Sequence, residues 1–363
     1  MLRDRVAQSS TFHATTRVVS GVGSIAGLDE EVRRLGVQRI AVICDRGVEQ
    51  AGLLDHILSG LTSEVTTVLA DANPGVKDCE EAVARMRESS CEAVVGIGGG
   101  SGLGLAKGVS IRLTNDGSIL DYEGTGRAPH PPAPMIAIPT TAGSGSEVSN
   151  ALVLHDPSRD REVIVRGPGH EPVVALLDAN LLTGLPRAPM LYAALDALSH
   201  AFEALWVRRR SIITDGLAEK AARAIVAHLP AGLDDRSPRV LQSLLEASTA
   251  ANLACGNTGL GLIHAMSSAP TVALPHGYQN GALFLAVAEF NRPHLTDEHQ
   301  RILDLVPALF DAVGWPGTFA VDDISGKDID AIVTSSSNHP FRENNIRPST
   351  DLDISRILHT AQP

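Results

Sequence analysis

Four side chains in the middle of this sequence have the types and spacing of ligands for one divalent metal ion. Asp196 and His200 stand four residues apart in the run LDALSHAFEA, so a helix would project both from the same face. His264 and His276 follow in two separate segments, GLIHAM and LPHG. One carboxylate and three imidazoles without a thiolate suit Fe(II), Zn(II), Mn(II) or Co(II), and such an ion can polarise a substrate carbonyl. Taken singly, each histidine is more often a core or surface residue, so the set is a hypothesis.

A glycine-rich turn, GIGGGSG, lies upstream of this set. Gly98, Gly99, Gly100 and Ser101 follow the apolar run AVVGI and precede a helical segment. Backbone N–H groups of such a turn can approach a pyrophosphate. Asp45 ends an earlier apolar run and could accept hydrogen bonds from an adenosine ribose while repelling a 2′-phosphate. The alternatives are a tight turn that needs glycine for its geometry and an aspartate that caps a turn.

A second candidate for cofactor contact is the loop PTTAGSGSE, residues 139–147. It follows the apolar run MIAI, and its small hydroxyl side chains would allow a cofactor to approach closely. The alternative is an ordinary flexible Gly/Ser loop.

Composition restricts the function classes. The chain is 44% hydrophobic and 20% charged, which is typical of a globular protein. Its length of 363 residues predicts two domains. A formal charge of −12 argues against a nucleic-acid partner. The four cysteines show no CxxC spacing, and we find no signal peptide and no apolar window long enough to cross a membrane. We therefore expect a cytoplasmic protein without a membrane partner.

The apolar pattern predicts the elements that must position these residues. Short apolar runs at 37–44, 93–97, 135–138 and 173–177 alternate with helical spacing, as at 76–89, and predict a parallel sheet covered on both faces. After residue 186 helical spacing dominates, at 193–207, 214–228, 240–254 and 300–313. We expect an α/β domain at 1–185 and an all-helical domain at 186–363, with the polar segment 335–349 as a surface loop.

Together these segments resemble the iron-dependent (group III) alcohol dehydrogenase family, from about residue 12 to residue 291. GGGSGLGLAKG resembles the family's GGGSxxDxxK turn, and AIPTTAGSGSEVS is close to its PTTAGTGSEVT loop. The run DALSHAFE resembles the signature D-A-L-x-H-A-x-E, and GLIHAM with LPHGYQNGA resembles the two histidine segments.

The resemblance implies a Rossmann-like dinucleotide-binding domain followed by a helical metal-binding domain, a dehydroquinate synthase-like architecture with the active site in the cleft. It implies one ion, Fe(II) or Zn(II), held by Asp196, His200, His264 and His276, and a homodimer. It also assigns residues to NAD(H): Gly98, Gly99, Gly100 and Ser101 to the pyrophosphate, Thr140, Thr141 and Ser144 to the nicotinamide side, and Asn73 and Asp45 to the adenosine half.

The chain departs from the family pattern at several positions. Gly104 replaces the aspartate of the glycine-rich turn, and Glu162 stands where a lysine often approaches the cofactor. Ser268 replaces a second histidine with a proton-relay role, so we expect a different relay in which Ser268 acts only through water or a ribose hydroxyl. The spacing from His264 to His276 is slightly shorter than usual, and the region after residue 291 resembles the short tail of maleylacetate reductases.

The leading hypothesis is a metal-dependent oxidoreductase that transfers hydride between NAD(H) and a small alcohol and its aldehyde or ketone. A maleylacetate-reductase-like enzyme is one alternative, although its relatives typically lack the full ligand set. Dehydroquinate synthase and glycerol-phosphate dehydrogenases share the architecture, but the basic residues that bind their phosphates have no clear equivalent here. A catalytically silent relative that binds nucleotide or metal is the third alternative, motivated by Gly104, Glu162 and Ser268.

Overall fold

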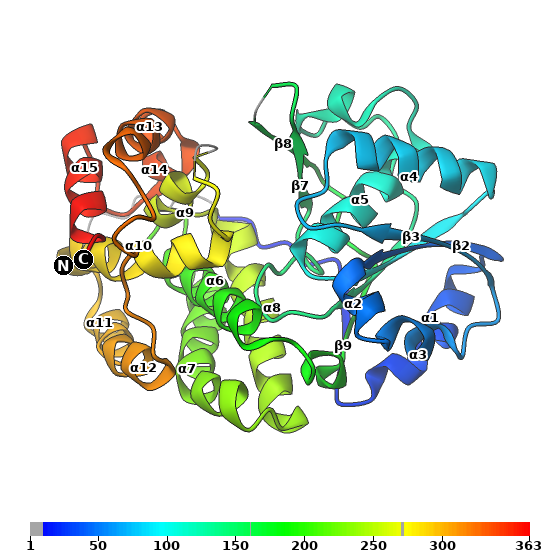
Figure 1. The fold of residues 1–363 in the computed structure, drawn as a ribbon, viewed down its shortest axis with the longest axis horizontal. Coiled ribbons are helices and arrows are strands. Elements are labelled where there is room, and N and C mark those ends of the chain that lie inside the picture. The colour runs from blue at the N-terminus through cyan, green and yellow to red at the C-terminus, as the bar shows by residue number, and fades with distance from the viewer. Residues whose placement is uncertain (1–9, 160, 270–271) are drawn as a thin grey trace.

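The computed structural model describes residues 10–159, 161–269 and 272–363. A sheet flanked by helices and a bundle of helices lie side by side (Figure 1). The predicted fold class, α/β followed by all-α, is therefore confirmed. The last strand of the large sheet ends at Leu177 and the first long helix of the bundle begins at Arg187. The division into domains at residues 185 and 186 stays a prediction.

The large sheet has six parallel strands in the order β1-β9-β6-β4-β2-β3. Its strands are β1 (Arg17–Ser20), β2 (Arg39–Asp45), β3 (Glu64–Ala70), β4 (Ala93–Gly98), β6 (Met135–Pro139) and β9 (Val174–Leu177). All residues of β4 and β6 are buried, as expected for strands covered on both faces. The four predicted strands are confirmed. The sequence missed β1 and β3 because these edge strands are half-exposed and lack a continuous apolar run.

Helices cover both faces of this sheet. Alternate residues of β2 point to opposite sides, so Ile40 and Val42 pack against one group of helices and Ala41 and Ile43 against the other. The first group is α1 (Leu28–Leu35), α2 (Arg46–Gln50) and α3 (Leu53–Leu58), preceded by the 3₁₀ turn η1 (Ser24–Gly27). The second group is α4 (Val76–Glu88) and α5 (Gly100–Thr114), followed by η2 (Ile119–Tyr122). This is the doubly covered sheet that the sequence predicted.

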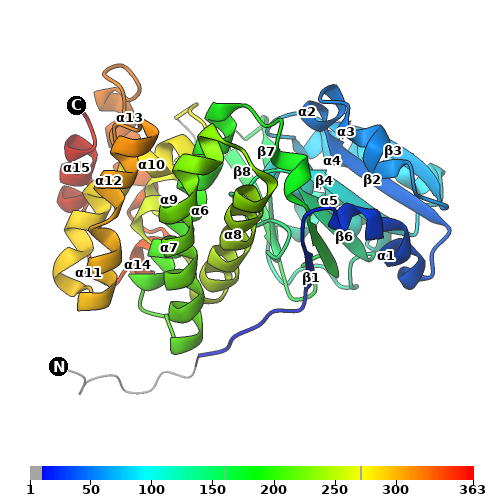
Figure 2. The same ribbon diagram turned by 90° about the horizontal axis from the view of Figure 1, so that it is seen from below.

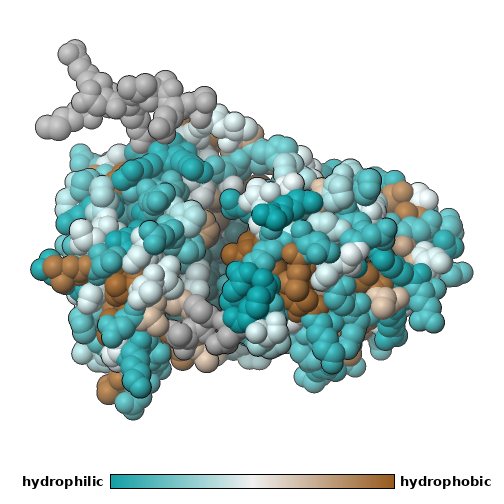
Figure 3. All heavy atoms as spheres, turned by 90° about the horizontal axis from the view of Figure 1, so that it is seen from above, coloured by the Kyte–Doolittle hydropathy of each residue, from teal (hydrophilic) through white to brown (hydrophobic). Residues whose placement is uncertain are grey.

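A small second sheet stands beside α5. It contains β5 (Gly124–Thr125), β7 (Ala151–Asp156) and β8 (Arg161–Arg166), in the order β5-β8-β7. Strands β7 and β8 form an antiparallel hairpin, and Figure 1 shows it beside the gap between the two parts. No apolar run predicted this hairpin, because buried and exposed residues alternate along both strands. Seen from above, the molecule is hollowed between the two parts, with an apolar area on the wall of the N-terminal part (Figure 3).

The C-terminal part is helical, and no strand of the described residues follows β9. Its elements are η3 (Ala179–Leu182), α6 (Arg187–Leu205), α7 (Ile212–Asp234), α8 (Pro238–Thr258), α9 (Leu262–Ser267), α10 (His276–Asn291), η4 (Arg292–His294), α11 (Asp297–Leu303), α12 (Val306–Val313), α13 (Gly326–Ser336), α14 (Pro340–Asn344) and α15 (Asp351–Thr360). Several begin at caps that the sequence contains, such as Ser325 and Thr350, each followed three residues later by aspartate. The segment 300–313, predicted as one helix, is divided into α11 and α12, with Pro307 in the first turn of α12.

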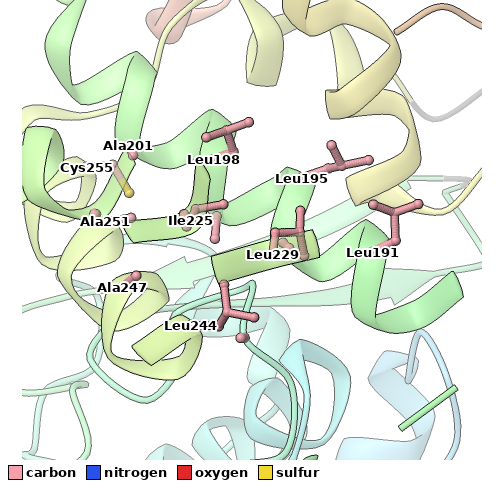
Figure 4. Packing of buried hydrophobic residues seen from close by; sticks show 14 of the residues in the cluster. Leu191, Leu195, Leu198, Ala201, Ile225, Leu229, Leu244, Ala247, Ala251 and Cys255 are labelled. Atoms are coloured by element: carbon pink, nitrogen blue, oxygen red, sulfur yellow. The ribbon is translucent and has the colours of Figure 1, made fainter. Parts of the chain in front are cut away.

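Helix α6 is the centre of this part. Leu191, Leu195 and Leu198 pack against Ile225 and Leu229 of α7, and residues of α8 complete the cluster (Figure 4). Figure 2 shows α6, α7 and α8 side by side, with α8 nearest the sheet. Because α6 is buried on its remaining face as well, its polar residues between Asp196 and Glu203 are enclosed by protein.

The polar segment 335–349 is not the surface loop that we expected. It contains α14, and the Asn345 side chain is fully buried. The Arg208 amide donates to the Asn344 carbonyl (2.8 Å), and the Ile346 amide donates to the Trp206 carbonyl (2.8 Å). The expectation was wrong because the side-chain amides of Asn344 and Asn345 donate to backbone carbonyls rather than to water.

The loop at residues 139–147 is packed closely between two helices. A Cβ at Gly143 would lie 2.8 Å from Ala193 Cβ on α6, and a Cβ at Gly145 would lie 1.7 Å from Asn252 Cγ on α8. The Asn252 amide and the Ser248 hydroxyl both donate to the Gly143 carbonyl at 3.1 Å. The two glycines therefore allow this loop of the N-terminal part to pack against the helical part.

We predict that Gly145→Ala destabilises the protein by about 2–4 kcal/mol, because its φ of 59° is strained for alanine and Asn252 fills the space. The urea midpoint of unfolding would measure this loss. Gly216→Ala is the matched control: this exposed glycine inside α7 has no atom near its Cβ position. The control should raise stability by about 0.5–1 kcal/mol. Equal midpoints for the two variants would contradict the close packing of the loop.

Candidate metal centre and nucleotide site

Three imidazoles converge on one carboxylate oxygen. Asp196 Oδ1 lies 3.5 Å from His200 Nε2, 3.5 Å from His264 Nε2 and 3.8 Å from His276 Nε2. Atoms that bind one ion at about 2.0–2.2 Å stand roughly 3.3–3.6 Å apart at the corners of a tetrahedron. Asp196, His264 and His276 also form a compact group with one ligand atom each within 4.8 Å of the others. The structure thus brings three of the four predicted ligands together at spacings that fit a divalent ion. The fourth, His200, lies outside this compact group, although its Nε2 is 3.5 Å from the shared Asp196 oxygen.

Separate elements deliver these side chains. Asp196 and His200 stand one turn apart on α6, His264 lies on α9, and His276 is the first residue of α10. The start of α10 can approach α6 because Gly277 has no side chain: a Cβ there would lie 2.0 Å from the Tyr192 carbonyl oxygen. The rings of His200 and His264 stack with centroids 4.7 Å apart. Side chains separated by up to 80 residues therefore meet through helix packing alone.

Two residues of the centre were given no role by the sequence analysis. Asn280 lies one turn after His276; its Nδ2 donates to Asp196 Oδ1 (2.8 Å) and lies 3.2 Å from His264 Nε2. Its Oδ1 is buried without a hydrogen-bond partner in the described part of the chain. Glu203 is fully buried and contacts His264 Nδ1. The spacing of 196, 200 and 203 along one helical face was the signal that could have identified Glu203.

Electrostatics favours the protonation states that metal binding requires. Burial opposes the ionised form of Asp196, but His200 and the other nearby imidazoles hold its pKa well below the usual range. Desolvation lowers the pKa of His200, and it lowers that of His276 to about 4, although the His276 side chain remains 48% exposed. Burial also acts against the protonated form of His264, but Glu203 and Asp196 raise its pKa to about 9. At neutral pH an ionised Asp196 and neutral His200 and His276 can each offer a lone pair to a metal ion. At His264 the metal must first displace a proton.

The predicted nucleotide residues gather at the carboxyl end of the sheet. Strand register places Asp45 beside Ala70, and Gly98 beside Pro139. The backbone N–H of Asn73 donates to Ser101 Oγ at 3.2 Å, and the backbone N–H of Thr140 donates to the Gly98 carbonyl at 3.0 Å. Nucleotides bind at this edge of open parallel sheets.

The two loops of this edge are in contact. A Cβ at Gly99 would lie 3.2 Å from Thr141 Oγ1, and a Cβ at Gly100 would lie 3.1 Å from Ser144 Cβ. The predicted pyrophosphate turn and the predicted nicotinamide-side loop therefore form one continuous surface.

Asp45 has a structural role in addition to the predicted contact with ribose. Its Oδ2 accepts a hydrogen bond from the Gly99 amide (2.6 Å), and a Cβ at Gly98 would overlap it at 2.3 Å. Burial raises the pKa of Asp45, while hydrogen bonds from the Gly99 and Gly102 amides oppose that rise. The alternative function of a turn cap is thus present in the structure, and the glycines are needed for it.

The departures from the family pattern lie near this edge and near the metal centre. A Cβ at Gly104 would make an ordinary 3.5 Å contact with the Val153 carbonyl oxygen. Glu162 is exposed on β8, opposite His155 of β7. Ser268 Oγ donates to the His264 carbonyl at 2.6 Å, so its proton is bound to the backbone.

The family described as iron-containing alcohol dehydrogenase matches residues 15–179, and the C-terminal region of the Fe-containing alcohol dehydrogenase family matches residues 190–311. The probable alcohol dehydrogenase EutG of Escherichia coli is 36% identical over 291 residues, which are 78% of this chain and 73% of that protein.

Solved structures show the same fold. The structure of a 1,3-propanediol oxidoreductase superposes with a TM-score of 0.91 at 24% identity and covers 98% of this chain and 100% of that chain. A sulfoacetaldehyde reductase from Bifidobacterium kashiwanohense, solved with NAD⁺, gives 0.88 at 25% identity, covering 98% and 99%. The predicted shortening of the C-terminal region was wrong. The region after residue 291 resembles the short tail of maleylacetate reductases, but five helices, α11 to α15, occupy it.

We predict that Asp196→Ala abolishes metal retention, because Oδ1 of Asp196 is the atom shared by all three imidazoles. Elemental analysis after dialysis should fall from about one ion per chain to near zero. The far-UV circular dichroism spectrum should be retained, since the leucines of α6 still pack this helix against α7 and α8. Asp234→Ala, an exposed aspartate at the end of α7, should keep its metal. Full metal content in the Asp196 variant would show that the metal is not bound at this centre.

Proposed function

Because this chain belongs to the iron-containing alcohol dehydrogenase family, we propose that its four ligand side chains and its glycine-rich turn serve one reaction. The protein is a metal-dependent oxidoreductase that transfers hydride between NAD(H) and a small alcohol and its aldehyde or ketone. The observation that carries the proposed site is the placement of three imidazole Nε2 atoms around Asp196 Oδ1.

The chain's own residues define how the reactants would be held. Asp196, His200, His264 and His276 would bind the ion, which when present polarises the substrate oxygen while the nicotinamide exchanges hydride. Asn280 holds the Asp196 carboxylate in place, and the exposed side of His276 is where we propose that substrate enters. Binding both reactants in one cleft can remove up to about 7–11 kcal/mol of the barrier.

The packing of the loop at 139–147 supports a common site. Gly143 contacts α6 at Ala193, less than one turn before Asp196. Thr141 and Ser144 on the same loop contact the glycine-rich turn. We therefore propose that Thr140, Thr141 and Ser144 hold the nicotinamide end beside the metal, and that Gly98 to Ser101, Asn73 and Asp45 hold the rest of NAD(H).

The substrate class stays broad. Relatives of this chain are named as dehydrogenases of methanol, choline and 1-propanol and as a lactaldehyde reductase. The maleylacetate reductase alternative rested on a shortened C-terminal region, and that region is not shortened.

We further propose a homodimer in the cytoplasm with domains at 1–185 and 186–363. No helix of the described residues is long and apolar enough to span a membrane. Light scattering would test the oligomeric state.

A screen of NADH consumption tests the function. Protein loaded with Fe(II) or Zn(II) should oxidise NADH with at least one member of a panel of small aldehydes, ketones and keto acids. A chelator should abolish this activity and added metal should restore it. NADH binding in calorimetry without turnover on any member of the panel would support the silent-relative alternative.

Ser268→Ala tests the proposed relay through a serine. Because the hydroxyl proton of Ser268 is bound to the His264 carbonyl, we expect kcat to stay within about threefold of wild type, with an unchanged pH profile. The lost hydrogen bond should cost about 1 kcal/mol of stability. A loss of two orders of magnitude in kcat with a shifted pH profile would instead assign the relay to Ser268.

A further inference from the structure

Glu203 is a buried carboxylate in contact with the metal centre but outside the set of four ligands. It lies on α6 one turn after His200, and its side chain is fully buried. Glu203 Oε2 lies 2.6 Å from His264 Nδ1, and Oε1 accepts the Ile263 amide at 2.6 Å. Within the described parts of the chain, His264 is its only ion-pair partner. A buried carboxylate without Lys or Arg needs such a partner.

The C-terminal segment encloses this carboxylate. A Cβ at Gly261 would lie 3.1 Å from Glu203 Oε1 and 3.2 Å from Asn345 Oδ1. Only glycine at this position therefore leaves the side chains of Glu203 and Asn345 undisturbed. Asn344 Nδ2 donates to the carbonyls of Thr258 (2.9 Å) and Leu260 (3.0 Å). The turn before α9 is thus held from both sides, and with it the backbone that carries His264.

The direction of the hydrogen bond decides which nitrogen of His264 can bind a metal. A carboxylate accepts hydrogen bonds and cannot donate when ionised, so Nδ1 of His264 carries the proton. Once a metal displaces the second ring proton, Nε2 presents its lone pair, and this atom lies 3.5 Å from Asp196 Oδ1 in the centre. We propose that Glu203 is a positioning residue that fixes the ring and the tautomer of His264 for metal binding. This inference rests on the proposed metal site.

Charge balance supports the same role. A dication bound by Asp196 and three neutral imidazoles would leave one uncompensated positive charge in a buried centre. The second buried carboxylate, Glu203, makes the assembly neutral without occupying a coordination position. Carboxylates behind metal-bound histidines orient the ring and raise its basicity.

The other two imidazoles lack such a carboxylate. At His200 the group beside Nδ1 is the Asn252 side-chain amide, whose Nδ2 lies 3.3 Å away. The His276 side chain is 48% exposed. Loss of Glu203 should therefore act on the metal through His264 alone.

Glu203→Gln is the decisive variant because it preserves size but replaces one acceptor by a donor. If its oxygen accepts the Ile263 amide, its NH₂ group faces His264 Nδ1 and shifts the ring hydrogen to Nε2. If the amide is reversed, two donors meet at Ile263. Neither arrangement serves both partners of the native carboxylate.

Co(II) alone is the probe, added to the metal-free, full-length protein and followed by its d–d absorption and by competition with a chelator. We expect Glu203→Gln to bind Co(II) about 10–100-fold more weakly, with a changed absorption band. Glu246→Gln, on the exposed side of α8, is the matched control and should bind like wild type. Addition of Glu203→Gln to a His264→Gln background should weaken binding no further.

Wild-type affinity and an unchanged band in Glu203→Gln would overturn the inference. If that variant does not fold, Gly261→Ala takes its place, because its Cβ displaces the carboxylate without removing it; wild-type affinity there would also overturn the inference. The proposed function fails separately. If Asp196→Ala binds Co(II) like wild type, no metal site exists at this centre. If Asp196→Ala loses Co(II) while Glu203→Gln binds it like wild type, only the role of Glu203 is rejected.

Discussion

The structure depends on the burial of two carboxylates, Asp196 and Glu203, on one face of α6. Ionised groups inside a protein are stable only when they are paired or bind a metal. Here the partners are imidazoles from α9 and α10, and no lysine or arginine of the described residues contacts either carboxylate. The positions of α9 and α10 against α6 are therefore fixed by charge as well as by apolar packing. The same pairing leaves a group of nitrogen atoms directed at one point.

The opposite face of α6 anchors this polar face. Leucines of α6 pack into α7 and α8, while α8 reaches the loop at 139–147 through Ser248 and Asn252. That loop also contacts the glycine-rich turn at the end of β4. The metal centre and the nucleotide edge are thus connected through two layers of direct contacts. Hydride transfer needs this, because the two reacting atoms must be held about 3–3.5 Å apart.

Much of the fold was predictable because the pattern was local. The buried strands β2, β4, β6 and β9 are continuous apolar runs, and α6 to α8 have helical spacing. The β7–β8 hairpin and the edge strands lacked that signal, since one face of each remains exposed. The segment around Asn344 and Asn345 misled the analysis for the opposite reason. Its polar side chains are buried, and polarity alone cannot show whether an amide binds water or backbone.

By itself, the sequence determined the kind of chemistry: one aspartate, three histidines and a glycine-rich turn, each in a recognisable local pattern. Only the tertiary structure decided that His264 and His276 meet Asp196 at one oxygen, that Asp45 lies beneath the glycines, and that Glu203 supports His264. The physical reason is the distance along the sequence over which each kind of interaction acts. Helical spacing and turn formation act over a few residues, whereas contacts between segments 54 to 61 positions apart follow from how whole helices and strands pack.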